Sequence, residues 1–180
     1  KVQPGTLLWS ETFSSAGAAV FYPHSIIESA NGNDVVVVGR CDNPYNLAAE
    51  AFFMQLDPGT GAVNSCNLYS DGSNGDDWFT SIEYANSPTG GTGYIIGGRS
   101  LSLIQNNVGY TPWMIKLDPN GNMIWSTLIQ HSFAYIPKEI NDVVERQNPN
   151  GTYEYYAVAH TPTTSDNMTV FKLDDLGGDS

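Results

Sequence analysis

Short runs of apolar, β-branched and aromatic residues recur along the chain, and clusters of glycine, proline, asparagine and aspartate separate them. None of the runs has the periodicity of an amphipathic helix. The run Val35–Val38 is apolar at every position, as expected for a strand that is buried on both faces between stacked sheets. The pattern predicts an all-β protein made of many short strands.

These runs repeat with a period of about 60 residues. Three stretches share a Leu-Asp dipeptide followed by a turn, with the aspartates at Asp57, Asp118 and Asp174. A second set recurs with the same period and reads DVVVVGR, GYIIGGR and EYYAVAH. A fixed period of this kind indicates a repetitive architecture with one structural unit per repeat.

Each unit divides into four extended runs, which in the middle unit are 81–85, 94–99, 113–117 and 123–128. The turn Asp118-Pro119-Asn120-Gly121 suits type I geometry, because proline presets φ at the second position and glycine accepts the positive φ that follows. Four antiparallel strands in a unit of roughly 40 to 60 residues are typical of one β-propeller blade. A β-sandwich is the alternative fold.

The pattern assigns three blades to residues 25–70, 81–130 and 142–180, the third without its outer strand. Residues 6–13, which read TLLWSETF, match the outer strand of a blade. Closed propellers use about four to eight blades. We therefore expect either a piece of a longer chain or copies that associate to close a ring. The longer chain is favoured, because a sheet left open at both ends exposes edges that invite aggregation.

Composition and charge exclude several functional classes. Apolar residues make up 41% of the chain and charged residues 14%, which indicates a folded protein rather than a disordered one. The chain carries 19 acidic and 7 basic residues, a net charge of −12, and no basic stripe of the kind that nucleic acids require. An anionic membrane surface would repel it, and no apolar run is long enough to span a bilayer.

The two cysteines, Cys41 and Cys66, fit no metal or redox motif. The predicted topology places one strand between them, which separates them by two ladder spacings, about 9.6 Å. That distance exceeds the roughly 7 Å reach of a disulfide. We therefore expect free thiols, unless the loop after Cys41 folds across the sheet.

The stretches KLDPNGNMIWS, SIIESANGNDVVVVGR and DDWFTSI resemble the propeller repeats of secreted and cell-surface bacterial proteins, especially those of Bacteroidota. The resemblance covers nearly the whole chain, and its motifs are structural. It implies an extracellular or cell-surface location and a non-catalytic module for adhesion or scaffolding. The implied partners are a protein or glycan ligand, together with the remaining blades of a longer chain or further copies of this one.

The candidate ligand-binding residues are Arg40, Arg99, His160, Asp76, Asp77 and Trp78. The two arginines and the histidine end equivalent strands, and the Asp-Asp-Trp motif precedes the first strand of the middle unit, so blade topology places them on one face. Two arginines and a histidine suit an acidic glycan or another carboxylate, and the tryptophan suits stacking on a sugar. The alternative is structural: an arginine forms a fork-like ion pair with the aspartates between blades.

Other site chemistry has weaker sequence support. Asp71–Asp77 has oxygen ligands at alternate positions, as in a calcium loop, but it lacks the distal glutamate, and an ordinary turn is the alternative. His24, His131 and His160 have no zinc-site spacing, and no other cofactor is expected. The chain has no G-x-S-x-G elbow or P-loop. A carbohydrate-acting propeller enzyme with a central-channel site remains the alternative function, because paired carboxylates are spatial rather than sequential.

Overall fold

The computed structural model describes residues 8–13, 19–42, 48–71, 75–87, 91–104, 107–129, 138–161 and 167–174. Within these ranges the chain forms eleven β-strands and no helix. The described part of the chain therefore has no helix with the length and apolar character that a membrane crossing requires. The prediction of an all-β protein is confirmed.

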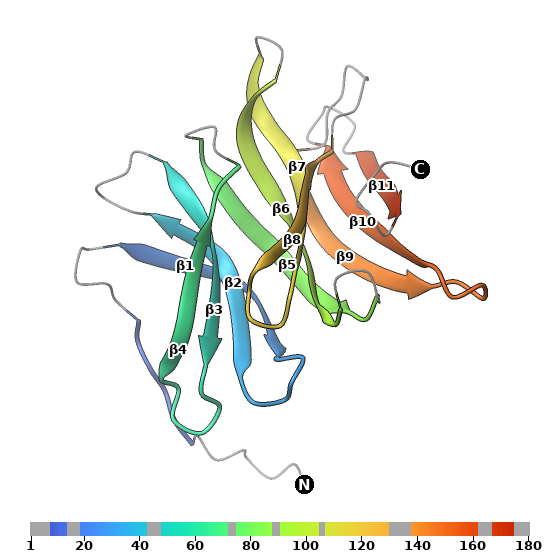
Figure 1. Ribbon diagram of the computed structural model, residues 1–180. Coiled ribbons are helices and arrows are strands. Elements are labelled where there is room, and N and C mark those ends of the chain that lie inside the picture. The colour runs from blue at the N-terminus through green and yellow to red at the C-terminus, as the bar shows by residue number, and fades with distance from the viewer. Residues whose placement is uncertain are drawn as a thin grey trace, which may run out of the picture.

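The strands form three antiparallel sheets that lie side by side (Figure 1). The first sheet contains β1 (Val20–Glu28), β2 (Val35–Asp42), β3 (Ala49–Leu56) and β4 (Val63–Tyr69). The second contains β5 (Asp77–Ala85), β6 (Gly93–Ile104), β7 (Asn107–Leu117) and β8 (Met123–Leu128). The third contains β9 (Glu139–Gln147), β10 (Tyr153–Thr161) and β11 (Asn167–Asp174). In each sheet the strands lie in sequence order, which is the arrangement expected of a blade rather than of a two-sheet sandwich.

The predicted strand positions hold, with differences at the ends. β8 has the predicted bounds 123–128, whereas β6 and β7 extend beyond the predicted runs because their pairing continues to Ile104 and Asn107. The first strand of every sheet begins earlier than the sequence suggested, at Val20, Asp77 and Glu139. Each of these strands contains a β-bulge, which interrupts the alternation of apolar and polar residues. The residues before the bulge therefore do not continue the sequence pattern of the strand.

The hairpin turns repeat as well. Gly121 has a φ of 84°, and its N–H donates to the carbonyl of Asp118 at 3.0 Å, as the type I turn prediction required. Gly61 has a φ of 77° and donates to the carbonyl of Asp57, four residues back, at 2.8 Å. The turn after the third strand of the first sheet is therefore one residue longer than that of the second, and both turns begin at an aspartate and end at a glycine with positive φ.

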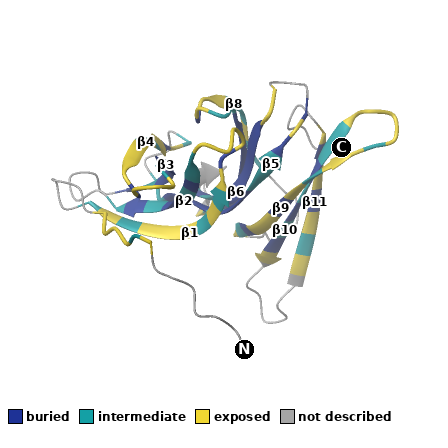
Figure 2. Ribbon diagram, turned by 90° about the horizontal axis from the view of Figure 1, so that it is seen from below, coloured by how far each residue is buried: buried dark blue, intermediate teal, exposed yellow. Residues whose placement is uncertain are grey.

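The sheets stack face to face, and each junction uses the same elements: β5 packs against β1, β2 and β3, and β9 packs against β5, β6 and β7. We call the face of a sheet that points toward the preceding sheet in sequence its leading face, and the opposite one its trailing face. The first junction buries side chains that include Val38, Phe53, Tyr94, Trp113 and Ile115. The second buries side chains that include Ile95, Met114, Ile140, Tyr155 and Phe171. Figure 2 shows the buried positions concentrated in the middle of the stack, whereas β1 is largely exposed.

Polar side chains tie the stacked sheets together. At the first junction the Tyr69 hydroxyl donates to the carbonyl of Gly121, and Gln55 Nε2 donates to the carbonyl of Pro119 at 3.2 Å. At the second junction Lys116 Nζ donates to the Tyr155 hydroxyl at 2.9 Å. Because these groups are buried or partly buried, losing a partner would leave a desolvated polar atom in the junction.

Residues 8–13 belong to the stretch predicted as an outer strand, and they form no strand. They lie instead against the first sheet, where Trp9 Nε1 donates to the carbonyl of Pro58 at 2.8 Å. The third sheet has three strands within the described part of the chain, and residues 175–180 of the predicted third blade lie outside that part. Cys41 and Cys66 are free thiols, the first buried and the second exposed, in line with the expectation.

Candidate functional site

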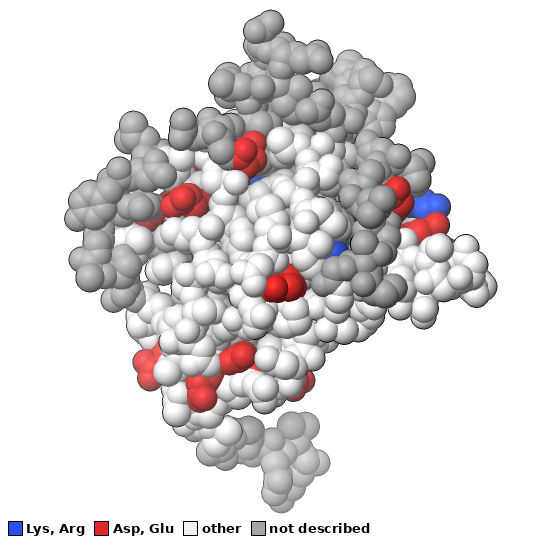
Figure 3. Space-filling model, in the orientation of Figure 1, with Lys and Arg blue, Asp and Glu red and all other residues white. Residues whose placement is uncertain are grey.

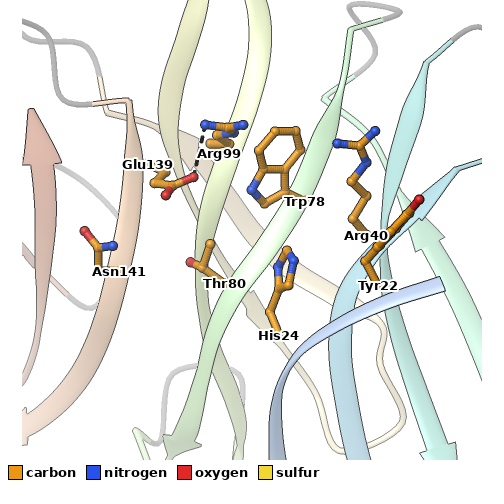
Figure 4. A pocket seen from close by; sticks show the side chains of 8 residues that line it. All are labelled: Tyr22, His24, Arg40, Trp78, Thr80, Arg99, Glu139 and Asn141. Atoms are coloured by element: carbon orange, nitrogen blue, oxygen red, sulfur yellow. Dashed lines mark ion pairs between the residues drawn. The ribbon is translucent and has the colours of Figure 1, made fainter. Parts of the chain in front are cut away.

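An open cleft of about 660 Å³ lies where the three sheets come together (Figure 4). The first strand of each sheet contributes side chains to the cleft, so the cleft extends across β1, β5 and β9. The lining side chains come from all three sheets and are Tyr22, His24, Arg40, Trp78, Thr80, Arg99, Glu139 and Asn141.

Three of the lining residues hold the same place in their sheets. His24 in β1, Thr80 in β5 and Asn141 in β9 are each the extra residue at a β-bulge, where the pairing register with the second strand shifts. A bulge re-aims a side chain and increases the local twist of the strand. Because the bulges recur at equivalent positions, the fold delivers one polar side chain from every sheet into the cleft.

The bulged residues also connect neighbouring sheets. His24 Nδ1 lies 2.6 Å from the carbonyl oxygen of Phe79, and since a carbonyl can only accept, Nδ1 carries the proton and donates. The Thr80 hydroxyl donates to the carbonyl of Ile140. Phe79 and Ile140 are equivalent residues, each directly before the bulge of the next sheet. The same side-chain-to-backbone bond therefore closes both junctions at the rim of the cleft.

Arg99 lies between two aromatic rings and a carboxylate. Its guanidinium carbon lies 3.3 Å from the ring centroid of Trp78 and 3.8 Å from that of Tyr110. Arg99 Nη1 pairs with Glu139 Oε2 at 3.1 Å, which links the second sheet to the third. Burial lowers the pKa of Arg99 from its ordinary value, and the charge of Glu139 opposes that effect. Aromatic stacking and the ion pair together fix the plane of the guanidinium.

Arg40 lies on the other side of the same tryptophan. It forms a bidentate pair with Asp42, with Nε–Oδ1 at 2.5 Å and Nη2–Oδ2 at 3.0 Å. Its guanidinium carbon is 5.6 Å from the ring centroid of Tyr22 and 5.1 Å from that of Trp78. The hydrogen bonds to Asp42 raise the pKa of Arg40 above its ordinary value. Two cations therefore flank one indole ring at the centre of the site (Figure 4).

The structure brings together three of the six residues that the sequence singled out: Arg40, Trp78 and Arg99. Asp76 lies close enough for its charge to favour the protonated form of both arginines, although burial still lowers the pKa of Arg99, and Asp76 Oδ1 accepts from the Ala49 N–H at 2.9 Å. His160 is exposed, is paired in register with Glu139, and does not line the cleft.

Two of the expected roles are not those that the geometry favours. Asp77 is fully buried, accepts from the Asp71 N–H at 3.1 Å and has a pKa raised by burial, so it supports the fold rather than facing a ligand. Trp78 is only 7% exposed and the Arg99 guanidinium covers its ring, so it orients an arginine instead of offering a free face to a sugar.

The predicted ion pair between blades exists, but its carboxylate is a different one. Arg99 pairs with Glu139 of the following sheet rather than with Asp76 or Asp77. Arg40 pairs with Asp42, two residues along its own strand. The sequence could not identify these partners, because which carboxylate lies nearest depends on how the sheets are offset.

Several site residues were missed in the sequence: Tyr22, His24, Thr80, Glu139, Asn141 and the stacking residue Tyr110. One signal for three of them was present. His24, Thr80 and Asn141 recur with the period of the repeat, and each lies near the start of the first run of its unit. A polar residue that recurs at that place marks a side chain directed to the centre of the stack.

The possible calcium loop falls partly outside the described residues, since 72–74 are not among them. Across the ranges that the structure describes, no three His, Cys, Asp or Glu side chains are grouped to hold a metal ion. His131 also lies outside those ranges.

The arrangement can present cationic N–H donors, hydroxyl and amide groups to an oxygen-rich ligand. Arg40 and Arg99 keep 32% and 19% of their side-chain surface exposed, so a ligand in the cleft can reach both. Among the described residues, Glu139 is the only carboxylate that lines the cleft, and it is paired with Arg99. No protein-family model matches the chain, and no curated protein matches it in sequence.

Proposed function

We propose that the chain is a segment of a β-propeller that serves as a non-catalytic extracellular binding module, for adhesion or scaffolding at a bacterial cell surface. Three observations support the propeller. The sheets share one strand order, both junctions use equivalent elements, and the first strand of each sheet borders a common cleft, as inner strands border a propeller channel. The location rests on the resemblance of the repeats to those of secreted and surface proteins.

The observation that carries the binding role is the pair of arginines held around Trp78. Each guanidinium has five N–H donors. The ion pairs with Asp42 and Glu139 engage two donors of Arg40 and one of Arg99. Arg99 Nε is buried, so a carboxylate-bearing ligand would take the remaining N–H groups of the terminal guanidinium nitrogens, in the planar geometry for which a fixed guanidinium is suited. The preferred ligand is an acidic glycan, with an acidic protein segment as the second choice.

The cleft supports binding rather than turnover. The Thr80 hydroxyl and His24 Nδ1 are both committed to backbone carbonyls of the next sheet. Within the described part of the chain, no second carboxylate lines the cleft beside Glu139, whereas glycoside hydrolysis uses a pair. The protein has a net charge of −12, with carboxylates scattered over the face in Figure 3, and two of its 7 basic residues line this cleft.

Calorimetric titration with an acidic oligosaccharide and its neutral counterpart tests this role. The acidic ligand should bind and the neutral one should bind far more weakly. Arg99→Gln should weaken binding about ten-fold or more, because a charge-assisted hydrogen bond is lost. Lys138→Gln is the matched control, since Lys138 is exposed, carries the same charge and does not line the cleft.

Equal binding by both variants, or the absence of binding to any acidic ligand across a glycan array, would contradict the proposal. If the protein released a cleaved product and Glu139→Gln abolished that release, the chain would be an enzyme rather than a non-catalytic binding module. Thermal unfolding of each variant separates a binding loss from a folding loss.

A further inference from the structure

The cleft has two tiers of side chains, because the first strand of each sheet contributes two residues to it. The first tier consists of Tyr22, Trp78 and Glu139, and the second of the bulged residues His24, Thr80 and Asn141. Each second-tier residue lies two positions further along its strand. Strand pairing adds the arginines to the first tier, since Arg40 pairs with Tyr22 and Arg99 with Trp78. Figure 4 shows the same division, with both guanidinium groups at one end of the cleft.

The first tier offers a ligand hydrogen-bond donors. The ion pairs with Asp42 and Glu139 leave N–H groups on the terminal nitrogens of Arg40 and Arg99, and both side chains are partly exposed. A guanidinium has donors and no acceptor. A carboxylate, which has acceptors only when ionised, is therefore the group that matches this end of the cleft.

The second tier offers hydrogen-bond acceptors. His24 Nδ1 donates to the carbonyl of Phe79 at 2.6 Å, so in the neutral ring Nε2 carries no proton and can only accept. The Asn141 amide contributes a carbonyl oxygen and an NH₂ group. Both residues are exposed, and neither His24 Nε2 nor the Asn141 amide has a hydrogen-bond partner within the described part of the chain. Ligand hydroxyl groups match this end, because a hydroxyl both donates and accepts.

The distance between the tiers favours a sugar acid over an acidic protein segment. Two positions along a strand span about 6.6 Å, close to the span from the carboxyl group of a sugar acid to the hydroxyl groups across its ring. An aspartate or glutamate side chain would reach the arginines but would place methylene groups against His24 and Asn141. That arrangement would desolvate their polar atoms without giving them partners, which is costly.

We propose that the cleft binds one sugar acid residue, with its carboxylate on Arg40 and Arg99 and its ring hydroxyls on His24 and Asn141. One hydroxyl donates to His24 Nε2, and another bonds to the Asn141 amide. This assignment names the ligand class of the cleft and rests on the binding role proposed above. Because the cleft is open, the sugar acid can belong to a longer glycan.

Four probes, each with a single carboxylate, test the assignment by titration followed with protein NMR. Two are the methyl glycosides of glucuronic and galacturonic acid. The third is cyclohexanecarboxylate, which has a six-membered ring and no hydroxyl group, and the fourth is glutamate capped at both backbone ends. At least one uronic acid glycoside should bind about ten-fold or more tighter than the other two acids, since two hydrogen bonds are added to the same carboxylate contact.

Variants locate the hydroxyl contacts. His24→Asn keeps an N–H donor for the Phe79 carbonyl, because the asparagine amide nitrogen takes the place of Nδ1, and it removes Nε2. This variant and Asn141→Ala should each weaken binding of the preferred uronic acid glycoside about five-fold and leave cyclohexanecarboxylate binding unchanged. Gln147→Ala is the matched control, since Gln147 is exposed at the end of the same strand as Asn141 and does not line the cleft.

The outcomes separate this assignment from the binding role itself. Equal affinity for the uronic acid glycosides and cyclohexanecarboxylate would overturn the assignment, while a loss of both in Arg99→Gln would still support the arginine site. Tighter binding of capped glutamate would assign the cleft to an acidic protein segment instead. A loss in His24→Asn that is equal for all probes would show a structural role and also overturn the assignment. If none of the acids bound, both proposals would fail. The amide spectrum of each variant checks that it is folded.

Discussion

Gly97 in β6 lies where the third sheet packs closely on the second, and replacing it tests whether the sheets stack as described. A Cβ at this position would lie 2.4 Å from Cγ2 of Ile140 and 2.7 Å from Cγ1 of Val143. Both neighbours are almost fully buried, at 0% and 4% exposed, so neither has open space to move into. Gly97→Ala should therefore cost about 1–3 kcal/mol through overpacking.

Gly109→Ala is the matched control. Gly109 lies in β7 of the same sheet, and a Cβ there would meet nothing within 4 Å. Its φ is not in the left-handed region, so the substitution should be neutral or should stabilise by about 0.4–1 kcal/mol through the unfolded state. Urea unfolding followed by tryptophan fluorescence measures both changes, and a chain of this size should lose roughly 2–4 °C in Tm per kcal/mol.

The clash predicts a specific rescue. Ile140→Ala removes the nearest atom, so its effect in the Gly97→Ala background should be smaller than its effect alone, and the two changes should be non-additive by more than about 0.5 kcal/mol. If Gly97→Ala were as stable as Gly109→Ala, or if the double variant were simply additive, the third sheet would not pack on the second in the way the structure gives.

Two further side chains yield predictions from their burial. Tyr69→Phe should cost about 1–3 kcal/mol, since the Gly121 carbonyl loses its donor, and a spectroscopic titration should find one tyrosine ionising near pH 12 because burial raises the pKa of Tyr69 to about 12. The stabilisation that the protonated Tyr69 hydroxyl gives the folded state is complete below the ordinary tyrosine pKa. It is lost as the pH rises through the raised pKa of the folded protein. Asp77→Asn should stabilise the protein at neutral pH, since burial raises the pKa of this carboxyl and its charged form is disfavoured. The gain should vanish in acid, where wild-type Asp77 is protonated in both states, and a constant gain across pH would exclude the desolvation argument.

The repeat made most of the fold predictable from the sequence. The turn ending in Gly121 and the strand 123–128 follow from local rules of turn chemistry and apolar patterning, which act over a few residues. The upstream halves of the first strands were not predictable in this way. A bulge at Thr80 or His24 breaks the alternation on which strand prediction relies, although it leaves the hydrogen-bonded pairing with the second strand in place.

From the sequence, the site could be predicted only as a set of equivalent positions, one in each repeat unit. Equivalent positions in a repeat occupy equivalent places, so Arg40 and Arg99 gather at one cleft together with the nearby Trp78. Which groups the arginines contact depends on the offset between neighbouring sheets, and the sequence of a single repeat does not determine that offset. Arg99 forms an ion pair with Glu139 across the junction between the second and third sheets, whereas the carboxyl group of Asp77 is buried and has a structural role.

Some of the residues that line the cleft also join the second sheet to the third. Under the proposed binding role, a carboxylate ligand on the free N–H groups of Arg99 would lie beside the ion pair with Glu139 that links the second sheet to the third. The sheets do not depend on that ion pair alone, because the Thr80 bond to Ile140 and the close packing at Gly97 hold the same junction. A ligand that weakened this ion pair would therefore not require the sheets to move. Its binding free energy would then carry no cost for reorganisation of the backbone, because the aromatic neighbours keep the arginines oriented.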